Sequence, residues 1–170
     1  SETENIAIFT KYNKSVGNLD LAFGARYDST DITNGAGLQN NSYSGLNANI
    51  VTTLNLDSNT KVFLGIGQAK RVPDARELYF TSFMGNVVGT QNLDQTTNRE
   101  IDLGYEISNN QFKAKIKTFY SQLSDYIYIE KGQATSAFQN IDATVYGTEI
   151  SGEYYATDDV IVDAGISYKR

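Results

Sequence analysis

Apolar and polar residues alternate along eight separate runs of this chain, and that period of two constrains its fold more than any other feature. Successive side chains of a β-strand point to opposite faces of a sheet, so alternation predicts strands with one apolar and one polar face. Twelve Tyr and eight Phe against one Pro also favour strands, because aromatic side chains fit a pleated surface. The alternating runs cover residues 5–13, 19–28, 46–56, 61–67, 100–107, 112–120, 146–154 and 160–168.

The connections between these runs are alternately short and long. Short turns are expected at 15–18, 57–59, 108–110 and 156–159, and long loops at 29–42, 71–98 and 131–139. Antiparallel strands joined in this way are typical of outer-membrane barrels, which have short periplasmic turns and long extracellular loops. The sequence therefore predicts an all-β, antiparallel up-and-down meander of about eight strands that forms part of a transmembrane β-barrel.

The two faces of the predicted strands differ in chemistry. One parity carries branched aliphatic and aromatic side chains, which suit lipid, and the other carries charged, amide and glycine residues, which suit a wet or protein-filled lumen. The alternative is the solvated face of an ordinary β-sandwich. If residues 108–110 close their hairpin, the cross-strand neighbours are Glu106 with Lys113, Gly104 with Lys115, and Asp102 with Lys117. The side chains predicted to face the lumen or a plug are Asp20, Arg26, Glu100, Asp102, Glu106, Lys113, Lys115, Lys117 and Glu149.

The absence of Cys and His narrows the possible function classes. Without Cys there is no disulfide or thiolate nucleophile, and without His the usual general base and the commonest metal ligand are missing. The spacing of Asp20, Asp102 and Glu149 does not suggest a catalytic carboxylate pair. We therefore expect a protein that is not an enzyme and has no catalytic residues, metal site or cofactor. The formal net charge of −6 argues against nucleic acid as a partner.

Two groups of motifs resemble a known family. The first group contains Arg71-Val72-Pro73, Glu77-Leu78-Tyr79, Gly89 and Asn92-Leu93, and it leads into residues 97–106. The second group contains residues 119–127, Asn140-Ile141-Asp142-Ala143 and residues 146–149. In this order and spacing the motifs resemble the C-terminal β-barrel region of TonB-dependent outer-membrane transporters, which are also called receptors.

This resemblance implies a fold, a function and a set of partners. Family members enclose a plug domain in a barrel of about 22 strands, so residues 1–170 are expected to be an internal part of such a barrel, with the plug and the remaining strands absent. The implied function is active import of a scarce nutrient, such as a ferric siderophore, cobalamin or a copper complex, across the bacterial outer membrane. The implied partners are outer-membrane lipid or lipopolysaccharide, that small-molecule or metal-chelate substrate, and the TonB–ExbB–ExbD system acting through the plug.

Two other functions stay open at this point. The chain could be a complete eight-stranded outer-membrane barrel that acts as a passive channel or as a structural or adhesion protein. It could instead be a soluble β-barrel binding protein, although charged residues on the inner face would be costly in a dry core.

The loop at 71–98 is the candidate substrate-binding site, because connections longer than about 12–15 residues are usually functional when ordered. Two guanidinium groups suit an anionic ligand, and an apolar tip suits a ligand with apolar surface. In the alternative interpretation, the charged residues pair with one another to pin the loop, and the tip packs on neighbouring loops. The candidate binding residues are Arg71, Arg76, Tyr79, Phe83 and Met84, and the candidate struts are Arg71, Asp74, Arg76 and Glu77.

Overall fold

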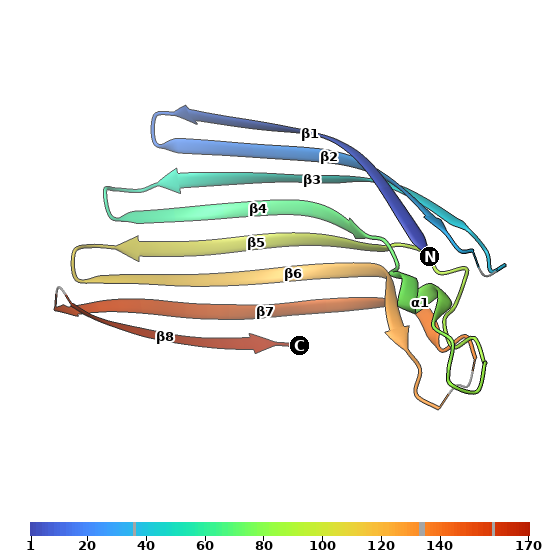
Figure 1. Ribbon diagram of the computed structural model, residues 1–170. Coiled ribbons are helices and arrows are strands. Elements are labelled where there is room, and N and C mark those ends of the chain that lie inside the picture. Colours follow the sequence, from blue (N-terminus) through green and yellow to red (C-terminus); the bar gives the residue numbers. More distant parts are fainter. Residues whose placement is uncertain (36, 133–134, 158) are drawn as a thin grey trace.

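The computed structural model is one antiparallel sheet of eight strands that follow each other in chain order (Figure 1). This confirms the predicted all-β meander. The structure describes residues 1–35, 37–132, 135–157 and 159–170; residues 36, 133–134 and 158, which belong to the predicted connections 29–42, 131–139 and 156–159, lie outside this description. The elements are β1 (Glu2–Val16), β2 (Leu19–Thr33), β3 (Asn41–Asn55), β4 (Thr60–Arg71), α1 (Ala75–Tyr79), β5 (Thr96–Ser108), β6 (Phe112–Ile129), β7 (Phe138–Thr157) and β8 (Val160–Lys169).

Several strands extend beyond the alternating runs, and the extensions toward the long connections change the predicted loops most. The predicted loop at 29–42 is wrong at both ends, because β2 continues to Thr33 and β3 already begins at Asn41. Similarly, β7 begins at Phe138, inside the predicted loop at 131–139. Backbone groups in these segments pair with neighbouring strands, as in Glu2 with Thr33. Pairing continues here without an apolar face, so alternation does not reveal these strand ends.

The hairpin between β5 and β6 has a different register from the one predicted. Its turn centres on residues 110–111, because the side-chain oxygen of Asn109 accepts hydrogen bonds from the backbone nitrogens of Gln111 and Phe112, at 2.8 and 2.9 Å. The predicted neighbours Glu106–Lys113 and Gly104–Lys115 are therefore wrong by two residues. The observed pairs are Ser108 with Lys113, Glu106 with Lys115, and Gly104 with Lys117.

One predicted contact of this hairpin survives the change of register. Lys117 Nζ lies 3.2 Å from a carboxylate oxygen of Asp102, although the two residues are diagonal and not directly opposite each other. Long side chains on adjacent strands can reach such diagonal neighbours. Glu106 instead forms its ion pair with Lys61 of β4, at 3.1 Å.

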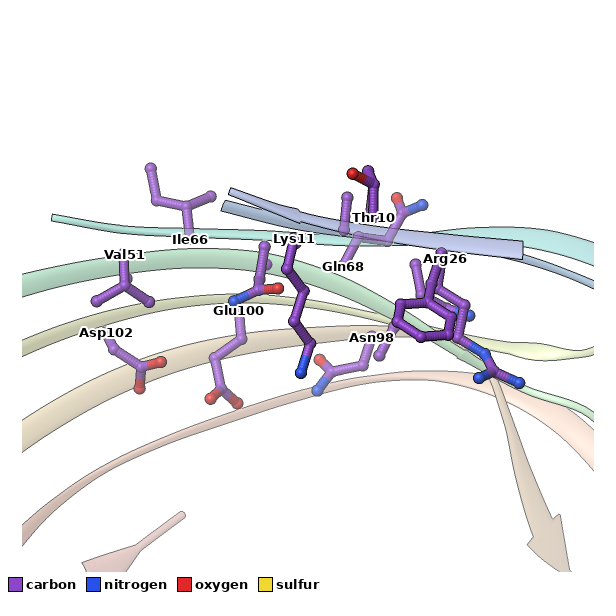
Figure 2. Close-up of a pocket in the computed structure, with 18 residues that line it drawn as sticks. Thr10, Lys11, Arg26, Val51, Ile66, Gln68, Asn98, Glu100 and Asp102 are labelled. Atoms are coloured by element: carbon purple, nitrogen blue, oxygen red, sulfur yellow. The ribbon is translucent and has the colours of Figure 1, made fainter. Parts of the chain in front are cut away.

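The register separates apolar and polar side chains onto two faces of the sheet, since residues directly opposite each other share a face. The apolar face is not a dry core: Ile50, Leu103 and Ile150 are 40%, 57% and 49% exposed. On the other side, Figure 2 shows that Glu100 and Asp102 point away from the face that carries Ile66. The sheet therefore has the two-sided character that the alternation predicts.

The buried apolar cluster lies where the long connections meet the sheet. It contains Ile32, Leu78, Tyr79, Leu93 and Ile127, from β2, α1, the β4–β5 connection and β6. Its partly buried neighbours are Leu38, Tyr43, Val72, Ala75 and Phe138. The dry core of this protein thus holds its loops in place and does not fill the space enclosed by its strands.

Only short helical structure accompanies the sheet. Within the described parts of the chain, no helix has both the length and the apolar character needed to cross a membrane. The single turn of α1 follows Pro73 and is capped by Asp74, whose carboxylate accepts hydrogen bonds from the backbone nitrogens of Arg76 and Glu77.

A glycine substitution tests the packing of the buried cluster. A Cβ at Gly89 would lie 2.5 Å from the backbone carbonyl of Leu78 and from the nitrogen of Tyr79, so the loop would have to move away from α1. We expect Gly89→Ala to lower the free energy of unfolding by about 1–3 kcal/mol, as for other overpacked sites. Denaturant unfolding measures this, with Gly35→Ala as the control because a Cβ there meets nothing within 4 Å. Equal unfolding midpoints for the two variants would contradict the packing.

Candidate functional site

The β4–β5 connection, residues 72–95, is tied to the sheet at its start by an ion pair. The guanidinium of Arg71 donates to both carboxylate oxygens of Glu77, at 2.9 and 3.0 Å. Glu77 also accepts a hydrogen bond from the backbone nitrogen of Asp74, at 2.9 Å, which completes a capping box at the start of α1. This geometry supports the strut interpretation for Arg71, since a bidentate pair occupies its guanidinium.

Tyr79 lies inside the buried cluster. Its side chain is 8% exposed, and its hydroxyl accepts a hydrogen bond from the side-chain nitrogen of Asn41, at 2.8 Å. A buried tyrosine normally satisfies its hydroxyl in this way. Tyr79 therefore packs within the protein in this structure, and its role in substrate binding stays a prediction.

The remaining candidates lie at the tip of the same connection. An isolated bridge between Thr81 and Val87 closes a small hairpin, and this hairpin presents Phe83 and Met84 to solvent. The side chain of Met84 is 89% exposed and Phe83 is fully exposed. Arg76 of α1 lies against Phe80, with its guanidinium 5.3 Å from the centre of the Phe80 ring. Arg76, Phe80, Phe83 and Met84 form what we call the loop tip, a cationic and apolar surface that the rest of the protein does not cover.

Asn140 holds the other end of the connection. Its side-chain nitrogen donates to the backbone oxygens of Asp94 and Asp125, at 3.1 and 2.7 Å, and its side-chain oxygen accepts from the backbone nitrogen of Asp94, at 2.9 Å. Asp125 has a φ of 56° and lies in a bulge of β6 between Leu123 and Tyr126. The sequence analysis missed this role of Asn140, although the broken alternation after residue 120 marks the bulge.

The chain that follows the loop tip, at Val87 and Val88, is also joined to the connection between β6 and β7. The backbone nitrogen of Ala137 donates to the oxygen of Val88 at 2.8 Å, and that of Ser136 donates to the oxygen of Val87 at 3.3 Å. These bonds and the Asn140 contacts make the tip part of an assembly built from two connections.

All nine residues predicted to face a lumen lie on the polar face of the sheet. One register row shows this, because it links Asp20, Thr53, Phe63, Gly104, Lys117 and Glu149 across six strands. Ion pairs connect neighbouring strands on this face: besides Lys61–Glu106 and Lys117–Asp102, Lys169 Nζ lies 2.9 Å from Glu149. Within β2, Arg26 pairs with Asp28 at 2.8 Å. Their contact with a lumen or a plug stays a prediction.

The polar face is hollowed between β1 and β5. A pocket of about 630 Å³ lies there, and small residues such as Gly24, Gly65 and Gly67 contribute to its lining. In Figure 2, Lys11 and Glu100 both extend from the polar face into the same region. Among the described residues, no group of three or more Asp and Glu side chains is arranged to hold a metal ion. The pocket can therefore offer polar contacts of both signs to a neighbouring molecule.

The Asn140 contacts give a stability prediction. Asn140→Ala removes three hydrogen bonds and leaves the backbone groups of Asp94 and Asp125 without them, so we expect unfolding to require about 1–3 kcal/mol less free energy. Hydrogen exchange at the Asp94 amide should accelerate in the same variant. Asn92→Ala is the control, because Asn92 is exposed in the same connection. Unchanged protection of Asp94 would show that Asn140 does not hold the connection.

Solved structures provide the first comparison with known proteins. The copper transporter OprC is 19% identical over 98% of this chain and 28% of that chain, with a TM-score of 0.78. The FrpB iron transporter from Neisseria meningitidis is 14% identical over 99% of this chain and 26% of that chain, with a TM-score of 0.74. The ferric-catecholate import receptor Fiu from E. coli K12 is 16% identical over 99% and 28%, with a TM-score of 0.71.

These likenesses establish the fold, and the chain spans about a quarter of the length of each of these proteins. Comparison with curated proteins finds no match. A family model described as "TonB dependent receptor-like, beta-barrel" matches residues 1–170. Because this match extends over the whole sequence, the chain belongs to the family of TonB-dependent receptor β-barrels.

Proposed function

We propose that this chain forms part of the wall of an outer-membrane active transporter that imports a scarce nutrient through a plugged barrel energised by TonB. TonB-dependent receptor barrels are outer-membrane proteins of Gram-negative bacteria. The observation that carries the proposal is the two-sided sheet, with an exposed apolar face and a charged face opposite. In the proposed transporter the apolar face contacts lipid, and residues 1–170 join further strands and a plug domain outside this sequence.

The proposed substrate is a small molecule or metal chelate. The solved relatives named above are described as a copper transporter, an iron transporter and a ferric-catecholate receptor, and these descriptions support a ferric siderophore or a copper complex as the class to test. Cobalamin is the third class that the family resemblance implies. We assign substrate contact to Arg76, Phe83 and Met84, because a guanidinium and exposed apolar groups lie together at the loop tip. Arg71 and Tyr79 stabilise the connection that carries this surface, through the ion pair with Glu77 and the hydrogen bond with Asn41.

The proposed mechanism is binding and passage, without catalysis. The charged residues of the polar face would line the lumen and contact the plug, and the TonB–ExbB–ExbD system would act on that plug. Ion pairs between neighbouring strands, such as Lys61–Glu106 and Lys169–Glu149, suit a hydrated wall because their charges remain partly exposed.

Two observations weigh against the other functions considered. In the described residues no ladder of hydrogen bonds joins β1 to β8, which disfavours a barrel closed by these eight strands alone. The exposed apolar face disfavours a soluble β-barrel binder, which would turn such side chains into a dry interior.

Substrate binding tests the loop tip. In the full-length transporter, Arg76→Ala combined with Phe83→Ala should weaken binding about tenfold, because a cationic and an aromatic contact are lost together. The probes are a ferric catecholate, a ferric hydroxamate, cobalamin and Cu²⁺, and the one that binds the unaltered transporter is titrated against the variant. Asn92→Ala should bind that probe normally. Unchanged affinity of the double variant would remove the loop tip from the binding site.

Lipid contact tests the apolar face. Phe23 lies on this face and is 38% exposed, so Phe23→Lys should lower the free energy of unfolding from lipid, by an amount between the cost of a lysine near the interface, about 0–1 kcal/mol, and its cost at mid-membrane, about 2–4 kcal/mol. Asn13→Lys is the matched control, because Asn13 lies opposite Ala22 on the polar face. A cost near zero for Phe23→Lys, or equal costs for both variants, would refute the membrane orientation.

A further inference from the structure

A groove on the apolar face ends in a polar rim toward the long connections. It has a volume of about 520 Å³, and its apolar lining includes Phe23, Ile50, Ile66, Ile101 and Tyr120. The register makes these five residues neighbours in one row across β2 to β6. All five are 38–51% exposed, so the row is not covered by other parts of the chain.

The next row toward the long connections has small and polar side chains instead of large apolar ones. It runs from Ala25 and Ala48, whose small side chains leave the groove open, to Gln68, Arg99 and Gln122. Gln68, Arg99 and Gln122 also line the groove. Gln68, Arg99 and Gln122 therefore form a cationic and amide rim, two residues along each strand from a continuous apolar row.

Arg99 is positioned at this rim by its neighbour. Its Nε donates to the side-chain oxygen of Gln68 at 3.0 Å, which orients the guanidinium along the sheet. Among the described residues, no carboxylate forms an ion pair with Arg99. An arginine on the lipid side of a barrel costs about 2–4 kcal/mol at mid-membrane but only about 0–1 near the interface. Arg99 thus fits the level of the lipid headgroups, where its terminal nitrogens can meet an anion.

We propose that this groove and its rim form a binding site for a lipid with a phosphate headgroup, whose acyl chains lie on the Phe23–Tyr120 row and whose phosphate binds Arg99. Guanidinium groups bind phosphate oxygens in a bidentate manner, and Gln122 lies directly opposite Arg99 as a further donor. The apolar groove below the cation favours a lipid over free phosphate, since only a lipid fills both parts. This inference rests on the outer-membrane placement proposed above.

Lipid titration by native mass spectrometry tests the site in the full-length, delipidated transporter. The probes are lipid A with its phosphates, a neutral glycolipid with acyl chains of the same length, and inorganic phosphate. We expect lipid A to bind more tightly than the neutral glycolipid, and Arg99→Gln to weaken lipid A binding about tenfold, as expected for loss of a charged hydrogen-bond partner. Arg99→Gln should leave binding of the neutral glycolipid unchanged.

Two controls make the result specific. Lys14→Gln removes another cation from the apolar face but at the short-turn end, opposite Leu21, and should bind lipid A normally. Gln68→Leu removes the orienting hydrogen bond and should weaken lipid A binding less than Arg99→Gln does.

Equal lipid A affinity for Arg99→Gln and the unaltered protein would overturn the proposal, and so would complete displacement of lipid A by inorganic phosphate. Substrate binding, measured in parallel, should not change in any variant, so failure of the lipid site is distinguishable from failure of the transport proposal.

Discussion

The backbone pairing of eight antiparallel strands is the constraint on which the rest of this structure depends. Because side chains alternate along each strand, one shared register assigns every residue to a face, and a slip of one residue would exchange the faces of a whole strand. The register aligns Phe23, Ile50, Ile66 and Ile101 in one row and Asp20, Phe63, Gly104 and Lys117 in another, on the opposite face. The exposed apolar face and the charged face opposite it are both consequences of that alignment.

The dry core lies at one end of this wall, and it explains how a long connection can be ordered. Leu78 and Leu93 are buried against β2 and β6, while Arg71 and Asn140 fix the two ends of the connection through ion pairing and hydrogen bonds. Contacts with the sheet therefore hold the connection at both of its ends. What remains uncovered is the loop tip, where Arg76 of α1 lies against Phe80 and a small hairpin exposes Phe83 and Met84, and this makes it the part best suited to meet a ligand.

Sequence reasoning predicts the two faces from the period of two, and it predicts the strand order from the alternation of short and long connections. It fails where side-chain hydrogen bonds or pairing of polar segments set the turns and the strand ends. The Asn109 side chain sets the turn of the β5–β6 hairpin and moves the register by two residues, and polar pairing extends β2 to Thr33. For the candidate site, the sequence points to the long connection but not to the surroundings of each residue: Arg76 and Phe83 are exposed, whereas the burial of Tyr79 depends on contacts with distant strands that no local pattern reports.

The most direct test of the central claim is a measurement of lipid accessibility along a single strand. Residues 1–170 contain no Cys, so single cysteines carrying a nitroxide label can be placed at each position of residues 100–107 in the full-length transporter, once any Cys elsewhere in it has been replaced, and studied in liposomes. The account predicts that collision with dissolved oxygen is high at positions 101, 103 and 105 and low at 102, 104 and 106, with a period of two. Uniform accessibility, or the opposite phase, would contradict a sheet with lipid on one side and a lumen on the other.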